Sequence, residues 1–167
     1  MKPKQLTHKE VENKKNTKEI IVVADGIRTP ENVGMLFRIA EAFGVKKVFL
    51  VGESPDLKNK KVIRTARSTQ KELEIQYLET MPKLIEILKK ETYKLIGLEL
   101  TNTSKSISKF DFTKNKKIAL IIGAERFGIT PKTLTSLDAT VHINLFGKNS
   151  SINVINALGI CLYEITR

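Results

Sequence analysis

The sequence of 167 residues has little of what marks disulfide-bonded, secreted or membrane-spanning proteins. It contains one cysteine, Cys161, so an internal disulfide is excluded and a reducing compartment is expected. No apolar run approaches the roughly 20 residues that a membrane-spanning helix needs. Residues 1–19, MKPKQLTHKEVENKKNTKE, lack the apolar core of a secretory signal. We therefore expect a cytoplasmic protein.

Aromatic residues are also scarce, at 6% of the chain with no tryptophan, so no platform for stacking nucleic-acid bases is evident. Two nucleotide-binding signatures are missing as well. Gly123 and Gly128 resemble half of a phosphate loop, but Ile129 and Thr130 stand where that loop has Lys followed by Ser or Thr. No G-x-G-x-x-G fingerprint occurs. We reject a nucleoside triphosphatase and do not expect an ordinary dinucleotide-binding fold.

Positive charge is what the sequence has in excess, with a net charge of +11 and a pI near 9.7. Residues 1–18 hold six Lys and two Glu, so we expect a basic polar leader there and one domain over 19–167. The densest basic run, LKNKKVIRTARSTQK at 57–71, has six cations and no acid. Such a run can be a solvated face, but with the high pI it favours a polyanionic partner, most often nucleic acid.

Apolar, β-branched runs alternate with helical patterns along the chain. The expected strands are 19–24, 46–52, 72–78, 94–100, 116–123 and 139–145, and the expected helices are 30–43, 80–93, 131–137 and 151–166. This alternation predicts an α/β fold with a mostly parallel sheet and helices on both faces. Ligands of such sheets bind beyond the carboxyl ends of the strands. Site residues are therefore expected in 24–34, 98–103, 123–130 and 144–153.

The stretch ADGIRTPENVGMLFR, residues 24–38, combines signals for a helix start with a glycine and an arginine four residues apart. Thr29 can cap the helix, and Pro30 suits its first position. Gly34 costs about 1 kcal/mol in a helix relative to Ala, so it indicates that something approaches closely. Arg38 lies near Gly34 on one face. It is either a solvated helix arginine or one held for a phosphate.

Five small polar side chains occur within eight residues between the last expected strand and the last helix: Asn149, Ser150, Ser151, Asn153 and Asn156. Ser150 or Ser151 can cap the helix, which accounts for one or two of them. The helix is apolar nearly all round and must be covered on more than one side, most simply by a partner subunit. Asn153 and Asn156 would need hydrogen-bond partners there, since an unpaired buried amide costs on the order of 1–3 kcal/mol.

Three stretches, in this order and spacing, resemble the motifs of the SpoU (TrmH-like) branch of the SPOUT RNA methyltransferases over about residues 20–166. The first, N-x-G-x-x-x-R, is matched by Asn32, Gly34 and Arg38. The second, a strand followed by G-x-E-x-x-G, is matched by Gly123, Glu125 and Gly128. Taken alone, Glu125 is either a structural loop residue or a site carboxylate.

The third motif, I-P-M-x-G-x-x-x-S-L-N-V, is similar to INLFGKNSSINV at 143–154. Here Asn144, Leu145 and Ile152 replace the family's Pro, Met and Leu. Leu145 and Ile152 keep volume and apolarity, whereas Asn144 replaces a rigid residue in the cofactor loop. We interpret these changes as tuning.

The resemblance implies a C-terminal deep trefoil knot, a homodimer, and S-adenosylmethionine bound in the knot. We expect no metal site. The cofactor positions it implies are Leu98 or Glu99, Gly123, Ile143, Leu145 and Ile152. The catalytic positions it implies are Asn32, Arg38, Glu125, Ser151 and Asn153.

The implied reaction is methyl transfer to a ribose 2′-hydroxyl of RNA. In the family the residue matching Arg38 is the proposed base, but a guanidinium stays protonated in ordinary settings. Alternatively, Arg38 grips the target phosphate by a bidentate contact, and Asn32 and Glu125 orient Arg38 or the ribose. The basic run supplies four candidates for docking the RNA backbone: Lys60, Lys61, Arg64 and Arg67.

The GAERFG form of the second motif resembles the branch that methylates guanosine in the tRNA D-loop, so tRNA is the expected substrate. Enzymes acting on the tRNA wobble position and on rRNA remain alternatives. Two other classes compete: a non-catalytic knotted dimer that binds RNA, and a fold that binds small nucleotides. Arg38, Glu125 and Asn153 argue against the first, and the missing phosphate-loop lysine and the basic surface argue against the second.

Overall fold

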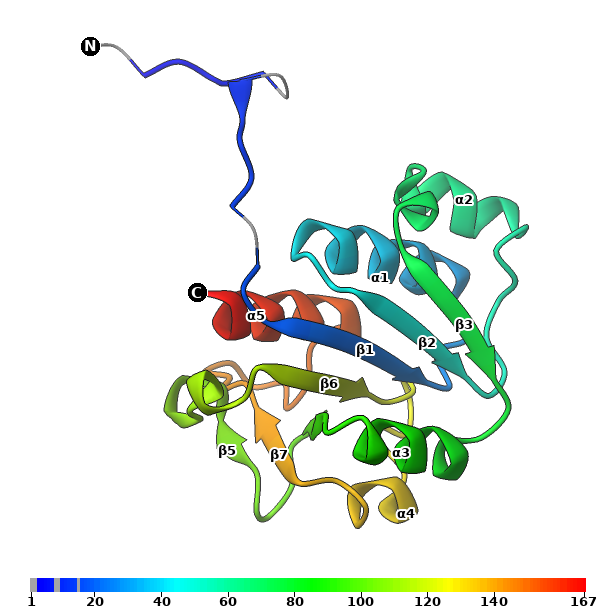
Figure 1. Cartoon of the computed structure of the whole chain (residues 1–167), viewed down its shortest axis with the longest axis vertical. Coiled ribbons are helices and arrows are strands. Elements are labelled where there is room, and N and C mark those ends of the chain that lie inside the picture. Colours follow the sequence, from blue (N-terminus) through cyan, green and yellow to red (C-terminus); the bar gives the residue numbers. More distant parts are fainter. Residues whose placement is uncertain (1–2, 8–9, 15) are drawn as a thin grey trace.

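The computed structural model describes residues 3–7, 10–14 and 16–167. Within the expected leader at 1–18, residues 1–2, 8–9 and 15 lie outside the described part. The strands are β1 (Glu19–Asp25), β2 (Lys47–Val51), β3 (Glu74–Leu78), β4 (Lys94–Leu98), β5 (Lys105–Ser106), β6 (Lys117–Ile122) and β7 (Ala139–His142). The helices are α1 (Pro30–Ala42), α2 (Lys60–Ala66), α3 (Met81–Lys90), α4 (Pro131–Leu134) and α5 (Val154–Thr166) (Figure 1).

The strands form one sheet in the order β3-β2-β1-β6-β4-β7-β5, and each pairing is parallel. The predicted α/β fold with a parallel sheet is therefore confirmed. One strand and one α-helix of the described residues were not predicted. β5 has two residues, too few to show a periodicity, and α2 buries only Val62 and Ala66, so its apolar side is hidden within the basic run 57–71.

Alternate residues of β1 pack against different layers, as a parallel sheet covered on both faces requires. Ile20 and Val22 belong to a core shared with α1, α2 and α5. Ile21 and Val23 belong to a second core shared with α3. Both faces of the sheet are thus covered, and the carboxyl ends of the strands are left as the open edge.

Helix α1 owes its position to an apolar stripe and to one glycine. The stripe consists of Val33, Leu36, Phe37 and Ala40, and all four are fully buried. A Cβ at Gly34 would lie 1.8 Å from Oγ1 of Thr65 and 2.7 Å from the backbone oxygen of Val62, both on α2. The close approach predicted at Gly34 therefore exists, but it is made by a neighbouring helix.

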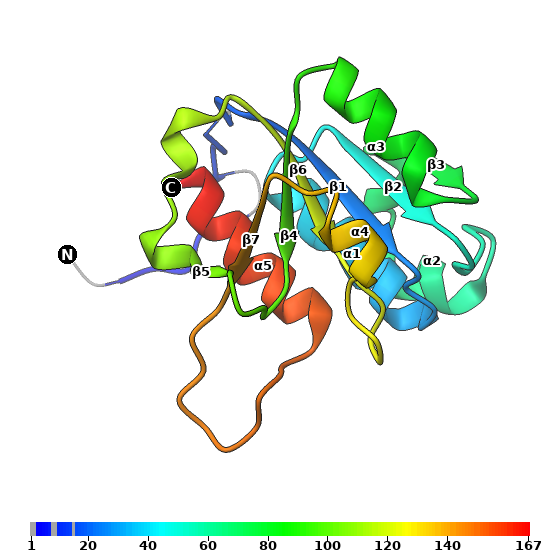
Figure 2. The same cartoon turned by 90° about the horizontal axis from the view of Figure 1, so that it is seen from below.

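The last strand and the last helix are shorter than predicted. The strand expected over 139–145 ends at His142, and the helix expected over 151–166 begins at Val154. Residues 143–153 form a long loop that projects beyond the strand ends (Figure 2). The chain then returns as α5, which packs against α1 and contacts β4.

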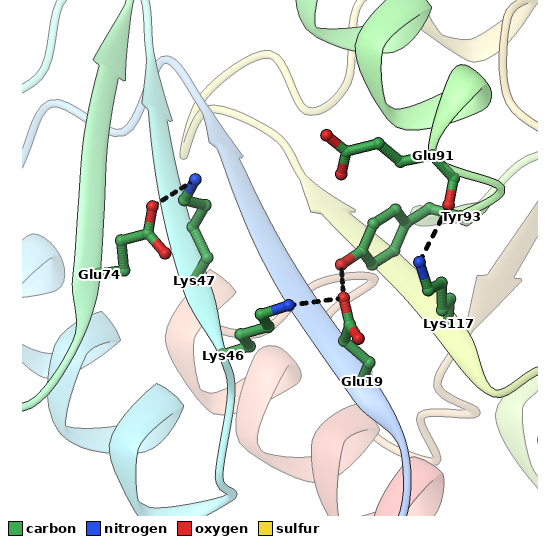
Figure 3. A network of polar contacts seen from close by, with 7 residues as sticks. All are labelled: Glu19, Lys46, Lys47, Glu74, Glu91, Tyr93 and Lys117. Carbon is green, nitrogen blue, oxygen red and sulfur yellow. Dashed lines mark hydrogen bonds and ion pairs between the residues drawn. The ribbon is translucent and has the colours of Figure 1, made fainter.

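The opposite, amino-terminal edge of the sheet is held by a polar network (Figure 3). The Tyr93 hydroxyl donates to the Glu19 carboxylate, and Nζ of Lys46 lies 2.9 Å from an oxygen of the same group. These two hydrogen bonds lower the pKa of Glu19, the one from Tyr93 contributing most. Burial, and then the Glu19 partner, raise the pKa of Tyr93. The network ties β1 to the segments that open β2 and β4, far from the open edge.

No helix in the described part of the chain is long and apolar enough to cross a membrane. Cys161 is a free thiol buried in α5, and its burial raises the pKa to about 12.

Candidate functional site

A cavity of about 600 Å³ opens at the carboxyl edge of the sheet. Its walls come from the segments that follow β4, β6 and β7 and from the start of α5, which is where three of the four expected ranges lie. The fourth range, 24–34, does not line the cavity but is hydrogen-bonded to its rim. A volume of this size lies within the roughly 300–1,000 Å³ of small-molecule sites.

The positions implied for the cofactor all line this cavity: Leu98, Glu99, Gly123, Ile143, Leu145 and Ile152. Four of them are aliphatic, and Thr101, Ser150 and Ser151 add hydroxyl groups to the wall. An apolar wall with a few polar groups is the usual lining of a small-molecule site. Their roles as cofactor ligands stay predictions.

The backbone of a neighbouring turn leaves no space for a side chain at Gly123. A Cβ there would lie 2.0 Å from the backbone carbon of Gly128 and 2.3 Å from the nitrogen of Ile129. The backbone between Ala124 and Gly128 folds back on itself, with N–H···O distances of 3.2 and 2.9 Å between those two residues. Gly123 thus allows this turn to close, and it also lines the cavity.

Glu99 fastens the same turn to the end of β4. Its Oε2 accepts from the backbone N–H of Ile129 at 3.0 Å, and its Oε1 accepts from that of Leu100 at 3.0 Å. Gly128 has φ of +62°, and a Cβ there would lie 2.2 Å from Oε2 of Glu99. The turn 124–128 is therefore rigidly held before any ligand arrives.

Glu125, at the tip of this turn, is bound to the start of α1. Its carboxylate accepts from the backbone N–H groups of Arg28 at 3.3 Å and Thr29 at 3.1 Å, and from Nδ2 of Asn32 at 3.0 Å. Thr29 occupies the N-cap position, but its side chain makes no capping hydrogen bond. A carboxylate from another segment thus satisfies backbone donors at the positive end of the helix.

Asn32 connects this carboxylate to the third motif. Nδ2 of Asn153 donates to Oδ1 of Asn32 at 3.2 Å. Oδ1 of Asn153 accepts from the backbone N–H groups of Ile155 at 2.8 Å and Asn156 at 3.4 Å, so Asn153 is the N-cap of α5. The expectation that Ser150 or Ser151 caps this helix was wrong, because the helix begins three residues later.

The hydrogen bonds keep Glu125 ionised. Partial burial raises the pKa of this carboxyl, but donors from Asn32, its own backbone and Thr29 outweigh that effect and lower the pKa from 4.5 to about 2. A general base works best with a pKa near the working pH. Glu125 is therefore suited to anchoring Asn32 rather than to accepting a proton.

Arg38 is not part of this cluster within one copy of the chain. It lies six residues beyond Asn32 on α1, about 240° further round the helix. Its guanidinium donates to Sδ of Met35 at 4.0 Å. The structure gives Arg38 no hydrogen bond to Asn32 or Glu125. Asn32 and Glu125 were expected to orient either Arg38 or the ribose. Within a single chain, only their orienting the ribose stays a prediction.

The remaining candidates are divided between two places. Ser151 lines the cavity and is exposed. The RNA-docking candidates are exposed on or just after α2: Lys60, Lys61, Arg64 and Arg67. Helix α2 packs on α1, and α1 lies between α2 and α5 (Figure 1).

Two residues that the sequence reading did not select hold the cavity loop. Oγ of Ser104 lies 2.8 Å from Nδ1 of His142, and Nε2 of His142 lies 3.1 Å from Oδ1 of Asn144. His142 also lines the cavity. Asn144, which replaces the family's proline, is thereby tied to the end of β7 and to the segment after β4. The unusual residue at position 144 was the one signal that could have pointed to this contact.

Over residues 3–7, 10–14 and 16–167, no three or more His, Cys, Asp or Glu side chains are grouped so that they could hold a metal ion.

Comparisons with known proteins agree with this arrangement. The model of the SpoU rRNA Methylase family matches residues 19–163. The 23S rRNA (guanosine-2′-O-)-methyltransferase RlmB of Acinetobacter baylyi is 31% identical over 157 residues, which cover 91% of this chain and 61% of that protein. The tRNA (guanosine(18)-2′-O)-methyltransferase of Saccharomyces cerevisiae is 30% identical over 166 residues, covering 94% of this chain and 11% of that one.

Among solved structures, the SpoU methyltransferase AviRb from Streptomyces viridochromogenes superposes with a TM-score of 0.82 and 25% identity, covering 91% of this chain and 60% of that chain. The chain spans about 60% of the length of several curated relatives that it matches. The match to the family model covers most of the chain, and one residue of each motif, Asn32, Glu125 and Asn153, belongs to the hydrogen-bonded series at the rim of the cavity. The chain belongs to the SpoU rRNA methylase family.

Proposed function

We propose that the chain transfers a methyl group from S-adenosylmethionine to a ribose 2′-hydroxyl of RNA. The observation that carries this proposal is the hydrogen-bonded series Glu125, Asn32 and Asn153, which joins the three motifs at the rim of one cavity. The names of the relatives support it, since those from Acinetobacter baylyi and Saccharomyces cerevisiae are both called guanosine 2′-O-methyltransferases.

The cavity fits the proposed cofactor. Its aliphatic wall of Leu98, Ile143, Leu145 and Ile152 suits the faces of an adenine ring, and hydroxyl groups stand nearby for the polar parts. AviRb has also been crystallised with AdoMet. When bound, this cofactor supplies an electrophilic methyl group on a positively charged sulfur.

The chain's own residues would then position the ribose. Asn32 and Asn153 present amide groups beside the cavity, and Glu125 keeps Asn32 in place. The attacking oxygen must lie about 3–3.5 Å from the methyl carbon, so fixed side chains at this rim are valuable. Ser151, which lines the cavity, would meet the incoming hydroxyl group. Arg38 would grip the phosphate next to the target, and the hydroxyl proton would pass to a phosphate oxygen or to water.

We further propose that two copies assemble and that the C-terminal segment is knotted. Helix α5 buries five apolar side chains but leaves Ile160 and Tyr163 exposed by 44% and 62%, which supports a second copy as their cover. Helix α5 also contacts β4 and the turn Ile107–Lys109 in the connection from β4 to β6, which supports threading past an earlier loop. A second copy would also be the source of an Arg38 near the cavity.

For the substrate we propose tRNA, with a guanosine in the D-loop as the target, because of the GAERFG form of the second motif. A 23S rRNA guanosine is the second candidate, since the relative from Acinetobacter baylyi is named for it. A solved structure titled for methylation of C/U34 on tRNA shares the fold at 20% identity and a TM-score of 0.79.

The test supplies the protein with S-adenosylmethionine carrying a labelled methyl group and with transcripts of tRNA or of 23S rRNA fragments. Methylation of a 2′-hydroxyl leaves a labelled dinucleotide that resists nuclease, and a transcript with a 2′-deoxy target is the control. Label on a base would contradict the proposal. RNA binding without any transfer would instead support the non-catalytic class.

A further inference from the structure

Two phenylalanines at the open edge are more exposed than any other large apolar side chain in the described part of the chain. Phe127 is 84% exposed and Phe146 is 97% exposed. Burying a phenylalanine side chain stabilises a protein, so leaving two in water forgoes that stabilisation. Neither is fixed by the family motifs, because both occupy unspecified positions within them. We therefore expect a bound partner to cover these two side chains.

Both side chains belong to segments that border the cavity. Phe127 stands on the turn 124–128 and itself lines the cavity, whereas Phe146 stands on the loop 143–153. The two segments project from the same edge of the sheet, on either side of the start of α5 (Figure 2). The turn is preorganised, since Glu99 and Glu125 hold it to β4 and α1. An aromatic ring on a fixed turn binds with little loss of side-chain entropy.

The neighbours of the two rings are cations. Arg126 precedes Phe127, Lys148 lies two residues after Phe146, and both are exposed. Neither forms an ion pair with any residue that the structure describes. Aromatic faces interleaved with unpaired cations match a single strand of nucleic acid, whose bases stack while its phosphates are neutralised.

We infer that Phe127 and Phe146 stack on unpaired bases of the RNA beside the nucleotide whose ribose enters the cavity. This inference rests on the proposed function and narrows its substrate to an unpaired segment. A ribose inside a regular helix has its neighbours stacked on both sides, whereas loops and bulges offer bases that can leave the stack. The low aromatic content gave no sign of a stacking site, because two rings suffice when the fold brings them to one edge.

The test measures RNA affinity by fluorescence anisotropy, with a hairpin whose loop is unpaired and a fully paired duplex of the same length. Phe127→Ala and Phe146→Ala should each weaken binding of the hairpin by about 5- to 150-fold, the range measured for loss of one base–aromatic stack. Duplex binding should change less than twofold. The salt dependence of hairpin binding should keep its slope, because no phosphate contact is removed. Ile87→Ala, at an exposed side chain on α3, is the matched control.

Conservative variants separate stacking from plain apolar contact. Tyr at either position should retain affinity, and Leu should not, since Leu has area but no aromatic face. Equal affinity for the Leu and Phe proteins would overturn the inference, as would an Ala effect below twofold. A changed sedimentation coefficient in the Ala variants would show that the rings lie in a contact between subunits. A loss of S-adenosylmethionine affinity, measured by calorimetry, would show that the rings cover the cofactor. Both results also overturn it.

The readout is binding, so it can be told apart from failure of the proposed function. If the protein transfers methyl groups, and the wild type and the Ala variants bind the hairpin equally well, the stacking inference is refuted and the enzymatic proposal is not. A protein that loses affinity on substitution but transfers no methyl group refutes the enzymatic proposal and leaves stacking in place.

Discussion

Asn153 donates a hydrogen bond to Asn32 across 121 residues of sequence, at 3.2 Å. The same Asn153 side chain caps α5 through its oxygen, so one amide both starts α5 and joins it to the first turn of α1. Because Asn32 also donates to Glu125, a substitution at any of the three residues should change the positions of the other two side chains. The first predictions follow from this relationship.

Replacing Asn153 should separate its two roles. Asn153→Ala removes the cap and should lower the free energy of unfolding by about 1 kcal/mol, measured by urea denaturation. Asn153→Asp keeps an oxygen that accepts from the helix N–H groups but removes the donor to Asn32. We expect Asp to restore stability and not methyl transfer. If Asp restores both, the contact with Asn32 has no part in the reaction.

Glu125→Gln tests whether the carboxylate anchors by its charge. The pKa of Glu125 is lowered from 4.5 to about 2, so its ionised form stabilises the fold above pH 4.5, and that contribution is lost as the pH falls toward about 2. The wild-type protein should therefore be more stable than Glu125→Gln at pH 7 and lose this advantage in acid. Urea unfolding of both proteins from pH 7 to pH 2 measures the difference.

The pH dependence of methyl transfer gives an independent check on the same residue. A carboxyl with a pKa of about 2 does not change its charge between pH 5 and pH 9, so Glu125 should contribute no titration to the activity profile there. An inflection in that range that disappears in Glu125→Gln would show that the residue exchanges a proton during the reaction.

Arg38→Ala should leave the affinity for S-adenosylmethionine unchanged and remove nearly all turnover. Within one copy the structure gives Arg38 no hydrogen bond or ion pair with a cavity residue, so its loss should leave the cofactor wall in place. Calorimetry and the labelled-methyl assay measure the two effects. Arg38→Lys keeps a charge without the planar fork, and it should recover little turnover if the contact is bidentate. Retained turnover in Arg38→Ala would remove this residue from the catalytic role.

Much of the fold could be predicted because its strands and helices follow from patterns within short stretches of sequence. The continuous apolar run of β1 indicates a buried strand. The spacing of Val33, Leu36, Phe37 and Ala40 indicates the buried side of α1. Why glycine is needed at positions 34 and 123 could not be predicted. At each position a side chain would clash with atoms of another segment, which only the folded chain brings near. The tie between Ser104 and His142 spans 38 residues and has no local pattern.

Charge reversal on α2 tests the docking surface. Lys60→Glu and Arg64→Glu should weaken RNA binding and reduce the slope of log affinity against log salt, by about 0.7–0.9 per lost phosphate contact. Nζ of Lys61 lies 3.3 Å from Oε1 of Glu31, so this cation is already paired and less available to a phosphate. Lys61→Glu is therefore the variant with which the slopes of the other two are compared. Anisotropy titrations from low to high salt measure the slopes. An unchanged slope in the first two variants would place the RNA elsewhere.

The position of Asn144 yields a prediction of the opposite kind, a substitution that should be tolerated. Asn144 is held through its side chain by His142, which in turn meets Ser104, whereas proline fixes its own φ near −65° without any partner. Asn144→Ala should loosen the cavity loop and weaken S-adenosylmethionine binding by calorimetry, and Ser104→Ala should do so to a smaller extent because it acts through His142. Asn144→Pro should restore binding, and it should also make affinity independent of Ser104, since the loop no longer needs that support. If Ser104→Ala weakens binding equally with and without the Asn144→Pro substitution, the contact is not what shapes the loop.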